Sequence, residues 1–271
     1  PGLVIATQEG YLMPNFSTYV ELFEIGFVNS QHVWLGIAFQ FAVYGPLIGG
    51  LIATWMDGGK EGLADLWERM IKWNVGWRWY VSAFAITFLL TGIPVTIFAL
   101  TGNFVSSTVP LSFILLIFIA QLFTSGLGEE PGWRGFLLPR LRARFEGEKY
   151  IWVLGLIWAI WHYPLTIYYS LPAFQGVPIP QMAIMILLAL AGQTMTLIGM
   201  TFIYVWLYNR TQSIFLLIVF HAFSNLFNYW LVTFLAEPQA IGLLPALMPW
   251  VFFIFFQKRL GKENFPGTPQ S

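Results

Sequence analysis

The chain has 271 residues, of which 57% are hydrophobic and only 10% are charged, and its thirteen basic residues balance its thirteen acidic residues. That composition is too apolar for a soluble domain. A net charge of zero gives no reason to expect nucleic acid as a partner. The absence of cysteine excludes disulfides, thiolate zinc sites and a cysteine nucleophile. The composition therefore predicts a protein that lies in a lipid bilayer.

Stretches of roughly 20 apolar residues, long enough to cross a hydrocarbon core of ~30 Å, recur along the chain. They predict an all-α polytopic transmembrane helical bundle, because open sheet edges cannot be satisfied in lipid. The seven predicted spans are residues 33–56, 78–101, 110–128, 150–169, 181–208, 213–235 and 241–257. Residues 33–257 are expected to form a single transmembrane domain, preceded by an N-terminal segment, 1–32, and followed by a tail, 258–271.

The basic residues all fall on one side of this predicted topology. They lie in or beside alternate loops and in the tail, whereas the intervening loops around 102–109, 170–180 and 236–240 carry none. Because loops rich in Lys and Arg remain in the cytoplasm, we expect a cytoplasmic C-terminus and an external N-terminus. The chain begins at Pro1 and residues 1–30 hold no basic n-region, so no intact signal peptide is expected.

Three features near the first span have structural interpretations. The segment GGKEGLADLWERMIKW predicts an amphipathic interfacial helix with its charges toward water. Its apolar side chains are expected to face lipid: Leu63, Leu66, Trp67 and Met70. The glycines of GPLIGG, residues 45–50, are expected to permit close helix contact. His32 is expected at the membrane interface, without a role in chemistry.

Ionisable side chains inside the spans are the strongest functional signal, because each costs at least ~2.5 kcal/mol at the centre of a bilayer. His162 and His221 each lie about eight residues from the predicted cytoplasmic end of their helix, which is roughly 12 Å of depth. Asn225 follows His221 by four residues and shares its helix face. Together with Glu129, these side chains are expected to converge in a cytoplasm-facing intramembrane cavity.

The segment after the third span contains two adjacent carboxylates, Glu129 and Glu130, and Arg134 can pair with either of them. Pro131 suits the first turn of a new helix. The neighbouring glycines allow a helix break or close packing: Gly126, Gly128 and Gly132. Because the histidines lie deeper than the end of the 110–128 span, we expect Glu129 to lie inside a longer or shifted helix.

The polar residues indicate a narrow range of chemistry. A carboxylate and an imidazole can take the proton from a water as it attacks an electrophile, while a second imidazole and an amide N–H stabilise the oxyanion. This set suits amide hydrolysis without a covalent intermediate. Glu129, His162 and His221 can alternatively ligate Zn²⁺. The same residues would also suit a proton-coupled transporter or a non-catalytic membrane scaffold or immunity protein.

Three motifs, in order, resemble those of the CAAX protease and bacteriocin-processing (CPBP, or Abi) family of intramembrane endopeptidases, which includes the Ras-converting CAAX protease. EEPGWRG matches the family's EExxxR motif, WAIWH its (F/W)xxxH motif and FHAFSN its HxxxN motif. The motif core covers about residues 110–235.

The resemblance implies a protease in which Glu129 is the general base on water and His162 is its partner. It makes His221 and Asn225 the oxyanion site, with Glu130 and Arg134 as supporting residues. It implies no cofactor, with zinc as the alternative. The implied substrate is a peptide or a prenylated protein with a CaaX C-terminus, cleaved near the cytoplasmic face.

The family also implies a fold and a location. Its members typically have eight helices, so residues 1–32 are expected to contain a truncated or degenerate first helix. The expected location is a prokaryotic cell membrane.

Overall fold

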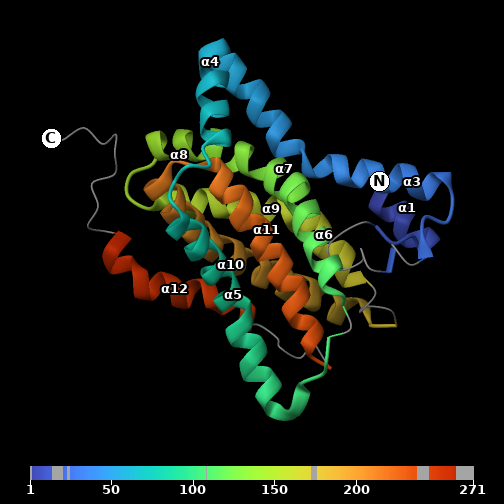
Figure 1. The fold of residues 1–271 in the computed structure, drawn as a ribbon. Coiled ribbons are helices and arrows are strands. Elements are labelled where there is room, and N and C mark those ends of the chain that lie inside the picture. The colour runs from blue at the N-terminus through green and yellow to red at the C-terminus, as the bar shows by residue number, and fades with distance from the viewer. Residues whose placement is uncertain are drawn as a thin grey trace. The chain divides into compact units, whose positions relative to one another are not determined.

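The computed structural model describes residues 2–13, 21–22, 25–107, 109–171, 176–236 and 244–260. These residues are almost wholly helical (Figure 1). Within them, extended pairing is limited to an isolated antiparallel bridge between Phe104 and Leu235. The predicted all-α fold is confirmed. Most of the predicted tail, including Lys262, and parts of the N-terminal segment lie outside the described residues.

The helices form two compact units, Pro1–Pro139 with Ser213–Ile241, and Arg140–Gln212 with Gly242–Ser271. The α-helices of the first unit are α1 (Gly2–Glu9), α3 (Ser30–Val43), α4 (Gly45–Ile71), α5 (Trp77–Phe98), α6 (Leu111–Gln121), α7 (Leu127–Glu130) and α11 (Ile214–Trp230). Its π-helical turns are η1 (Ala99–Asn103), η2 (Leu122–Gly126) and η3 (Pro131–Leu137), and η5 (Leu231–Phe234) is a 3₁₀ turn. The second unit contains α9 (Lys149–Ser170), α10 (Ile179–Thr211) and α12 (Leu244–Leu260), and α8 (Leu138–Arg144) begins at the end of the first unit.

Five of the described helices are long and apolar enough to cross a membrane, and a bent pair raises the number to six. The prediction of seven spans is therefore approximate. The predicted span 33–56 is not one straight helix, because α3 and α4 meet at 46° around Tyr44. The predicted span 241–257 corresponds to α12, whose apolar part, Leu244–Ile254, is shorter than a full span. Several long apolar helices make the chain a multi-pass membrane protein.

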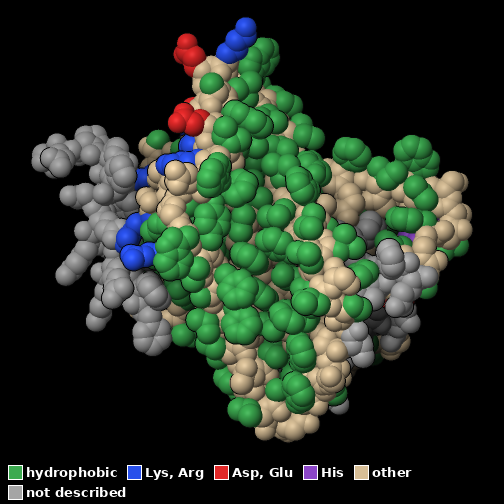
Figure 2. Space-filling view, viewed as in Figure 1, with side chains coloured by type: hydrophobic (Ala, Val, Ile, Leu, Met, Phe, Trp, Pro, Cys, Tyr) green, Lys and Arg blue, Asp and Glu red, His purple; other side chains and the backbone are tan. Residues whose placement is uncertain are grey.

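The outer surface of these helices is apolar, as expected where lipid replaces water. On α5, for example, the exposed side chains include Phe88, Leu89 and Ile97. Figure 2 shows hydrophobic side chains over this part of the surface and charged side chains around the bend of α4 at the top of the view. The core of the first unit forms where α11 lies between α5 and α6 (Figure 1).

The predicted interfacial helix is the second half of α4, beyond a kink that divides α4 into two helices (Figure 1). The backbone is kinked at Gly59, where φ is 56° and ψ is −141°, a conformation open mainly to glycine. The prediction that its apolar side chains all face lipid is wrong for Leu66, which is only 1% exposed, whereas Trp67 is 60% exposed. Leu66 is buried because it packs against η3 at Gly135.

The polar face of the same helix is also partly engaged. Arg69 donates from Nη1 to the carbonyl oxygen of Gly135 at 2.9 Å and pairs through Nη2 with Asp65 at 2.6 Å. Ser213, which caps the start of α11, donates to the carbonyl oxygen of Lys72 at 2.5 Å. The end of α4 is thus tied to both η3 and α11.

His32 is fully buried within the protein, and its predicted position at the membrane interface stays a prediction. Its Nε2 lies 2.6 Å from the carbonyl oxygen of Leu12, and its Nδ1 accepts from the backbone N–H of Val28 at 3.2 Å. The ring stacks on Tyr11 with centroids 4.7 Å apart. Because a carbonyl oxygen only accepts, the proton lies on Nε2. His32 therefore serves the contact between α1 and α3.

Gly50 of the GPLIGG stretch confirms the prediction of close helix contact. A Cβ added to Gly50 would lie 2.9 Å from the Cα of Gly132. A Cβ added to Gly132 would lie 2.1 Å from the carbonyl oxygen of Pro46. The first turns of α4 therefore contact η3 through backbone atoms, which fixes the helix that carries Glu129 and Glu130.

A substitution at Gly132 should separate these two helices. We expect Gly132→Ala to lower stability by at least about 1–3 kcal/mol, because backbone atoms cannot move aside as a flexible side chain can. Thermal unfolding in detergent micelles measures the change. Gly49→Ala is the matched control, since a Cβ there meets nothing within 4 Å. Equal melting temperatures for the two variants would contradict the close contact.

Candidate active site

The chain from Leu111 to Arg144 is one helical segment of 34 residues. This confirms the prediction that Glu129 lies inside a longer helix than hydropathy marks. Pro131 lies in the first turn of a helical element, as predicted, although no break precedes it. It opens the π-helical turn η3 within the continuous segment, and such turns can re-satisfy backbone groups that a proline disturbs.

The π-helical turns have partners on the α3–α4 side of the unit. Tyr44, at the bend between α3 and α4, donates its hydroxyl to the carbonyl oxygen of Phe123 in η2. Arg69 donates to the carbonyl oxygen of Gly135 in η3. A π-helical turn departs from the regular i→i+4 ladder, so these side-chain donors support backbone that an α-helix would bond internally.

The turn η2 also decides which residues face α11. In a regular α-helix each residue turns by about 100°, so Gln121 and Glu130 would point about 180° apart. Closing i→i+5 bonds takes more residues per turn and rotates the later residues back toward the direction of Gln121. Both side chains consequently reach α11, where Gln121 contacts Asn225 and Glu130 contacts His221.

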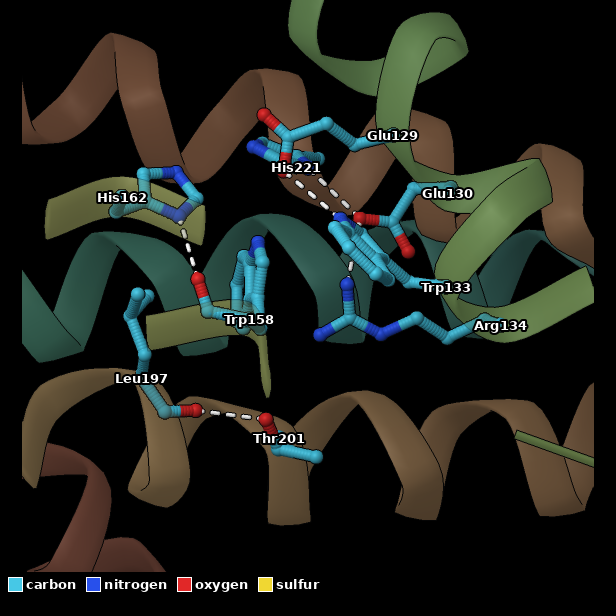
Figure 3. Close-up of polar contacts among 9 residues, drawn as sticks. All are labelled: Glu129, Glu130, Trp133, Arg134, Trp158, His162, Leu197, Thr201 and His221. Atoms are coloured by element: carbon cyan, nitrogen blue, oxygen red, sulfur yellow. Dashed lines mark hydrogen bonds and ion pairs between the residues drawn. The ribbon is translucent and has the colours of Figure 1, made fainter. Parts of the chain in front are cut away.

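Glu130 joins the first and third motifs. Its Oε1 accepts from Arg134 Nη1 at 3.1 Å and lies 2.7 Å from His221 Nδ1 (Figure 3). The side chains of Glu130 and Arg134 are both 0% exposed, and His221 is also buried. A carboxylate between a guanidinium and an imidazole can balance positive charge on both, and an ionised carboxylate accepts the ring proton on Nδ1.

Burying these charged side chains costs free energy of folding, and this cost favours a functional role for the cluster. Burying ions rarely stabilises a protein more than a well-packed apolar set does. Glu130 Oε2 is also buried, and among the described residues it has no hydrogen-bond partner. A buried polar atom of this kind is uncommon in a purely structural contact.

Glu129 is buried one residue earlier on the same helix. Its Oε2 accepts from Trp133 Nε1 at 3.3 Å, one turn further along (Figure 3). Trp133 was not predicted as part of the site. The signal in the sequence is its i+4 spacing from Glu129, which places the indole N–H on the face of the carboxylate.

Asn225 hydrogen bonds to a residue that the sequence analysis missed. Its Nδ2 donates to Gln121 Oε1 at 2.7 Å, and Gln121 is only 2% exposed. The backbone allows this approach at Gly126, where a Cβ would lie 2.8 Å from the carbonyl oxygen of Ile218. The signal in the sequence is the lone amide in the apolar run FILLIFIAQLF, since an amide in lipid usually has a partner.

His162 belongs to the second unit, on α9. Its Nδ1 donates to the carbonyl oxygen of Trp158 at 2.8 Å (Figure 3), so in the neutral ring the lone pair lies on Nε2. The buried Trp158 ring meets the imidazole edge-on at 5.7 Å and Tyr204 at 5.4 Å. The aromatic residue of this motif thus holds its histidine in place. The predicted convergence of His162 with Glu129 and His221 stays a prediction.

A metal centre was the alternative use of these side chains. Among the described residues, no three His, Asp or Glu side chains gather closely enough to hold a metal ion. The choice between a metal-free reaction and a zinc reaction therefore belongs to experiment.

The fold and the site define a class: a multi-pass helical membrane protein with a buried carboxylate, guanidinium and imidazole between two membrane helices. Residues 110–227 match the family described as "Type II CAAX prenyl endopeptidase Rce1-like". All three motifs lie within this segment. Over this segment, the chain is therefore similar to the family that the motifs predict.

A curated relative points the same way over a shorter stretch. The chain is 39% identical over 70 residues to CAAX prenyl protease 2 of Methanococcus maripaludis. That stretch is 25% of this chain and 23% of the relative, so the chain spans about a quarter of the length of the relative that it matches.

Breaking the buried pair should destabilise the protein strongly. We expect Glu130→Gln to lower stability by about 3–5 kcal/mol, because Arg134 keeps its charge in an apolar interior. Thermal or denaturant unfolding in micelles measures the loss. The double variant Glu130→Gln with Arg134→Gln should be less destabilised than the single one.

The surface pair of α4 supplies the control. Asp65 is 66% exposed in its pair with Arg69, and exposed pairs contribute only about 0–1 kcal/mol. Asp65→Asn should therefore leave the unfolding midpoint close to that of the wild type. If the Glu130→Gln variant were as stable as Asp65→Asn, the buried contact would not contribute the predicted stability.

Proposed function

We propose that the chain is an intramembrane endopeptidase that hydrolyses a peptide bond with a water activated by Glu129 and His162. The contact between Glu130 and His221 carries the proposal, because it joins helices 91 residues apart in sequence at a buried point. A structural salt bridge would need only Glu130 and Arg134. The family match over residues 110–227 supports the reaction class.

In the proposed mechanism the Glu129 carboxylate accepts a proton from water, and the oxygen attacks the carbonyl carbon of the scissile bond. His162, with Nδ1 held by the Trp158 carbonyl, presents Nε2 to the same water. The oxyanion of the tetrahedral intermediate accepts hydrogen bonds from His221 Nε2–H and Asn225 Nδ2–H. The proton then passes to the leaving nitrogen, and the C–N bond breaks.

The contacts within each motif suit these roles. Glu130 contacts Nδ1 of His221, and the proposal assigns the oxyanion to Nε2 of the same ring. Trp133 holds one oxygen of Glu129. Each proposed reacting group thus has a neighbour that fixes its orientation, as general acid–base and oxyanion chemistry require.

We propose a prenylated protein C-terminus of the CaaX type as the substrate, cleaved near the cytoplasmic face. The name of the Methanococcus maripaludis relative supports this choice. The apolar surface of the helices also supports it, because a prenyl chain can remain in lipid while the peptide enters between helices. The location proposed is a prokaryotic cell membrane.

The proposed orientation follows from the positions of the basic residues. A reporter fused after Lys262 should lie in the cytoplasm, and one inserted near Ser106 should lie outside. Reporter activity on the same side for both fusions would contradict this topology.

Replacing the proposed base should abolish turnover without unfolding the protein. Glu129→Gln keeps the volume and the acceptor for Trp133 but removes the proton-accepting charge, so kcat should fall by about 10²- to 10⁴-fold. Cleavage of a prenylated CaaX peptide by purified protein measures this, beside an unprenylated peptide. Glu129→Gln, His162→Ala and His221→Ala variants that all retain wild-type cleavage would leave a scaffold or a transporter as the function.

Chelation separates the two forms of the protease. A reaction driven by Glu129 and His162 should survive exhaustive EDTA or phenanthroline treatment, and the purified protein should contain no stoichiometric zinc. Activity that is lost on chelation and restored by Zn²⁺ would make Glu129, His162 and His221 zinc ligands instead.

A further inference from the structure

Gln121 holds the side chain of Asn225 at a fixed point on α11. The two amides meet at 2.7 Å, with Asn225 Nδ2 donating to Gln121 Oε1. Gln121 is almost fully buried, and it is the last residue of α6 before the π-helical turn η2. The family motifs do not include this position.

Because a primary amide is planar, the contact with Gln121 also affects the direction of the second N–H of Asn225. The amide group is planar and carries two N–H donors on one nitrogen. When one N–H bonds to Gln121, rotation about the last side-chain bond of Asn225 is restricted. The direction of the second N–H is then set by Gln121 rather than by free rotation.

The helical segment that contains Gln121 also orients His221, which lies one turn before Asn225 on α11. Glu130 contacts His221 at 2.7 Å, and η2 turns Gln121 and Glu130 toward the same partner helix. His221 and Asn225 lie on one face of α11, about one turn apart. One continuous segment therefore orients both proposed oxyanion donors.

We propose that Gln121 is a positioning residue of the protease: it orients the Asn225 amide so that the second N–H can stabilise the oxyanion. This inference rests on the proposed function and adds a residue to its machinery. Gln121 acts through Asn225 and does not itself contact the substrate.

A second interhelical hydrogen bond to α11 provides a matched control. Thr91 of α5 donates to Asn228 Oδ1 at 2.8 Å, and Thr91 is also buried. Asn228 lies three residues after Asn225 but has no place in the proposed reaction. Thr91→Val removes a bond of the same kind and nearly the same length, so it reports what the loss of one such bond does to structure alone.

The experiment compares kcat and KM for a farnesylated CaaX peptide across wild type and variants, together with melting temperatures. Gln121→Leu, which keeps the approximate size and loses the acceptor, should lower kcat by about 10- to 10²-fold, less than the 10²- to 10³-fold loss of an oxyanion donor. KM should change by less than about twofold, because ground-state binding is not altered. Thr91→Val should lower the melting temperature similarly and leave kcat near the wild-type value.

Two further variants separate positioning from packing. Gln121→Glu retains an acceptor oxygen whether or not it is ionised, so its kcat should exceed that of Gln121→Leu by about tenfold. The double variant Gln121→Leu with Asn225→Ala should be no slower than Asn225→Ala alone, because Gln121 acts only through that amide.

The possible results distinguish a failure of this inference from a failure of the proposed protease function. The inference is overturned if Asn225→Ala is slow while Gln121→Leu turns over like wild type. Equal kcat losses in Gln121→Leu and Thr91→Val, or a Gln121→Glu variant no faster than Gln121→Leu, also overturn it. A wild-type chain that cleaves no peptide, or an Asn225→Ala variant with wild-type kcat, overturns the proposed function and the inference together.

Discussion

The packing of the first unit depends on the contacts of the buried Glu130 carboxylate. This carboxylate is fully enclosed, it accepts from Arg134 within its own helix, and it contacts His221 of α11. A charge in an apolar interior is tolerable only with such partners. The arrangement therefore requires α11 to lie against the segment from Leu111 to Arg144, in the register that the close approach at Gly126 permits.

Further contacts of this unit hold that segment against α4. The backbone of α4 touches η3 at Gly132, and Arg69 adds a hydrogen bond to Gly135. Contacts between backbones leave little freedom for the helix to rotate. The segment that carries the carboxylates is thus held by α4 through backbone contacts and by α11 through polar contacts, and the proposed catalysis needs such preorganisation.

Much of this could be predicted from the sequence, and the failures have physical causes. Hydropathy located the long helices because lipid demands continuous apolar runs, and the spacing of His221 and Asn225 placed them on one face. Helical periodicity could not place Gln121 and Glu130 together, because η2 is a departure from that period. Leu66 was misplaced since an amphipathic pattern does not distinguish lipid from a neighbouring helix. The contact of Gln121 with Asn225 could not be predicted, because the two residues lie 104 residues apart in the sequence.

The pairing of Glu130 with Arg134 inside one helix also bears on how the chain enters the membrane. These two residues are made together, whereas His221 follows 91 residues after Glu130. At a synthesis rate of about 5–20 residues per second, the helix exists for roughly 5 to 20 seconds before α11 emerges. During that interval the arginine one turn away already neutralises the carboxylate. The EExxxR spacing thus gives the nascent helix its own counter-ion during insertion, before the tertiary partner exists.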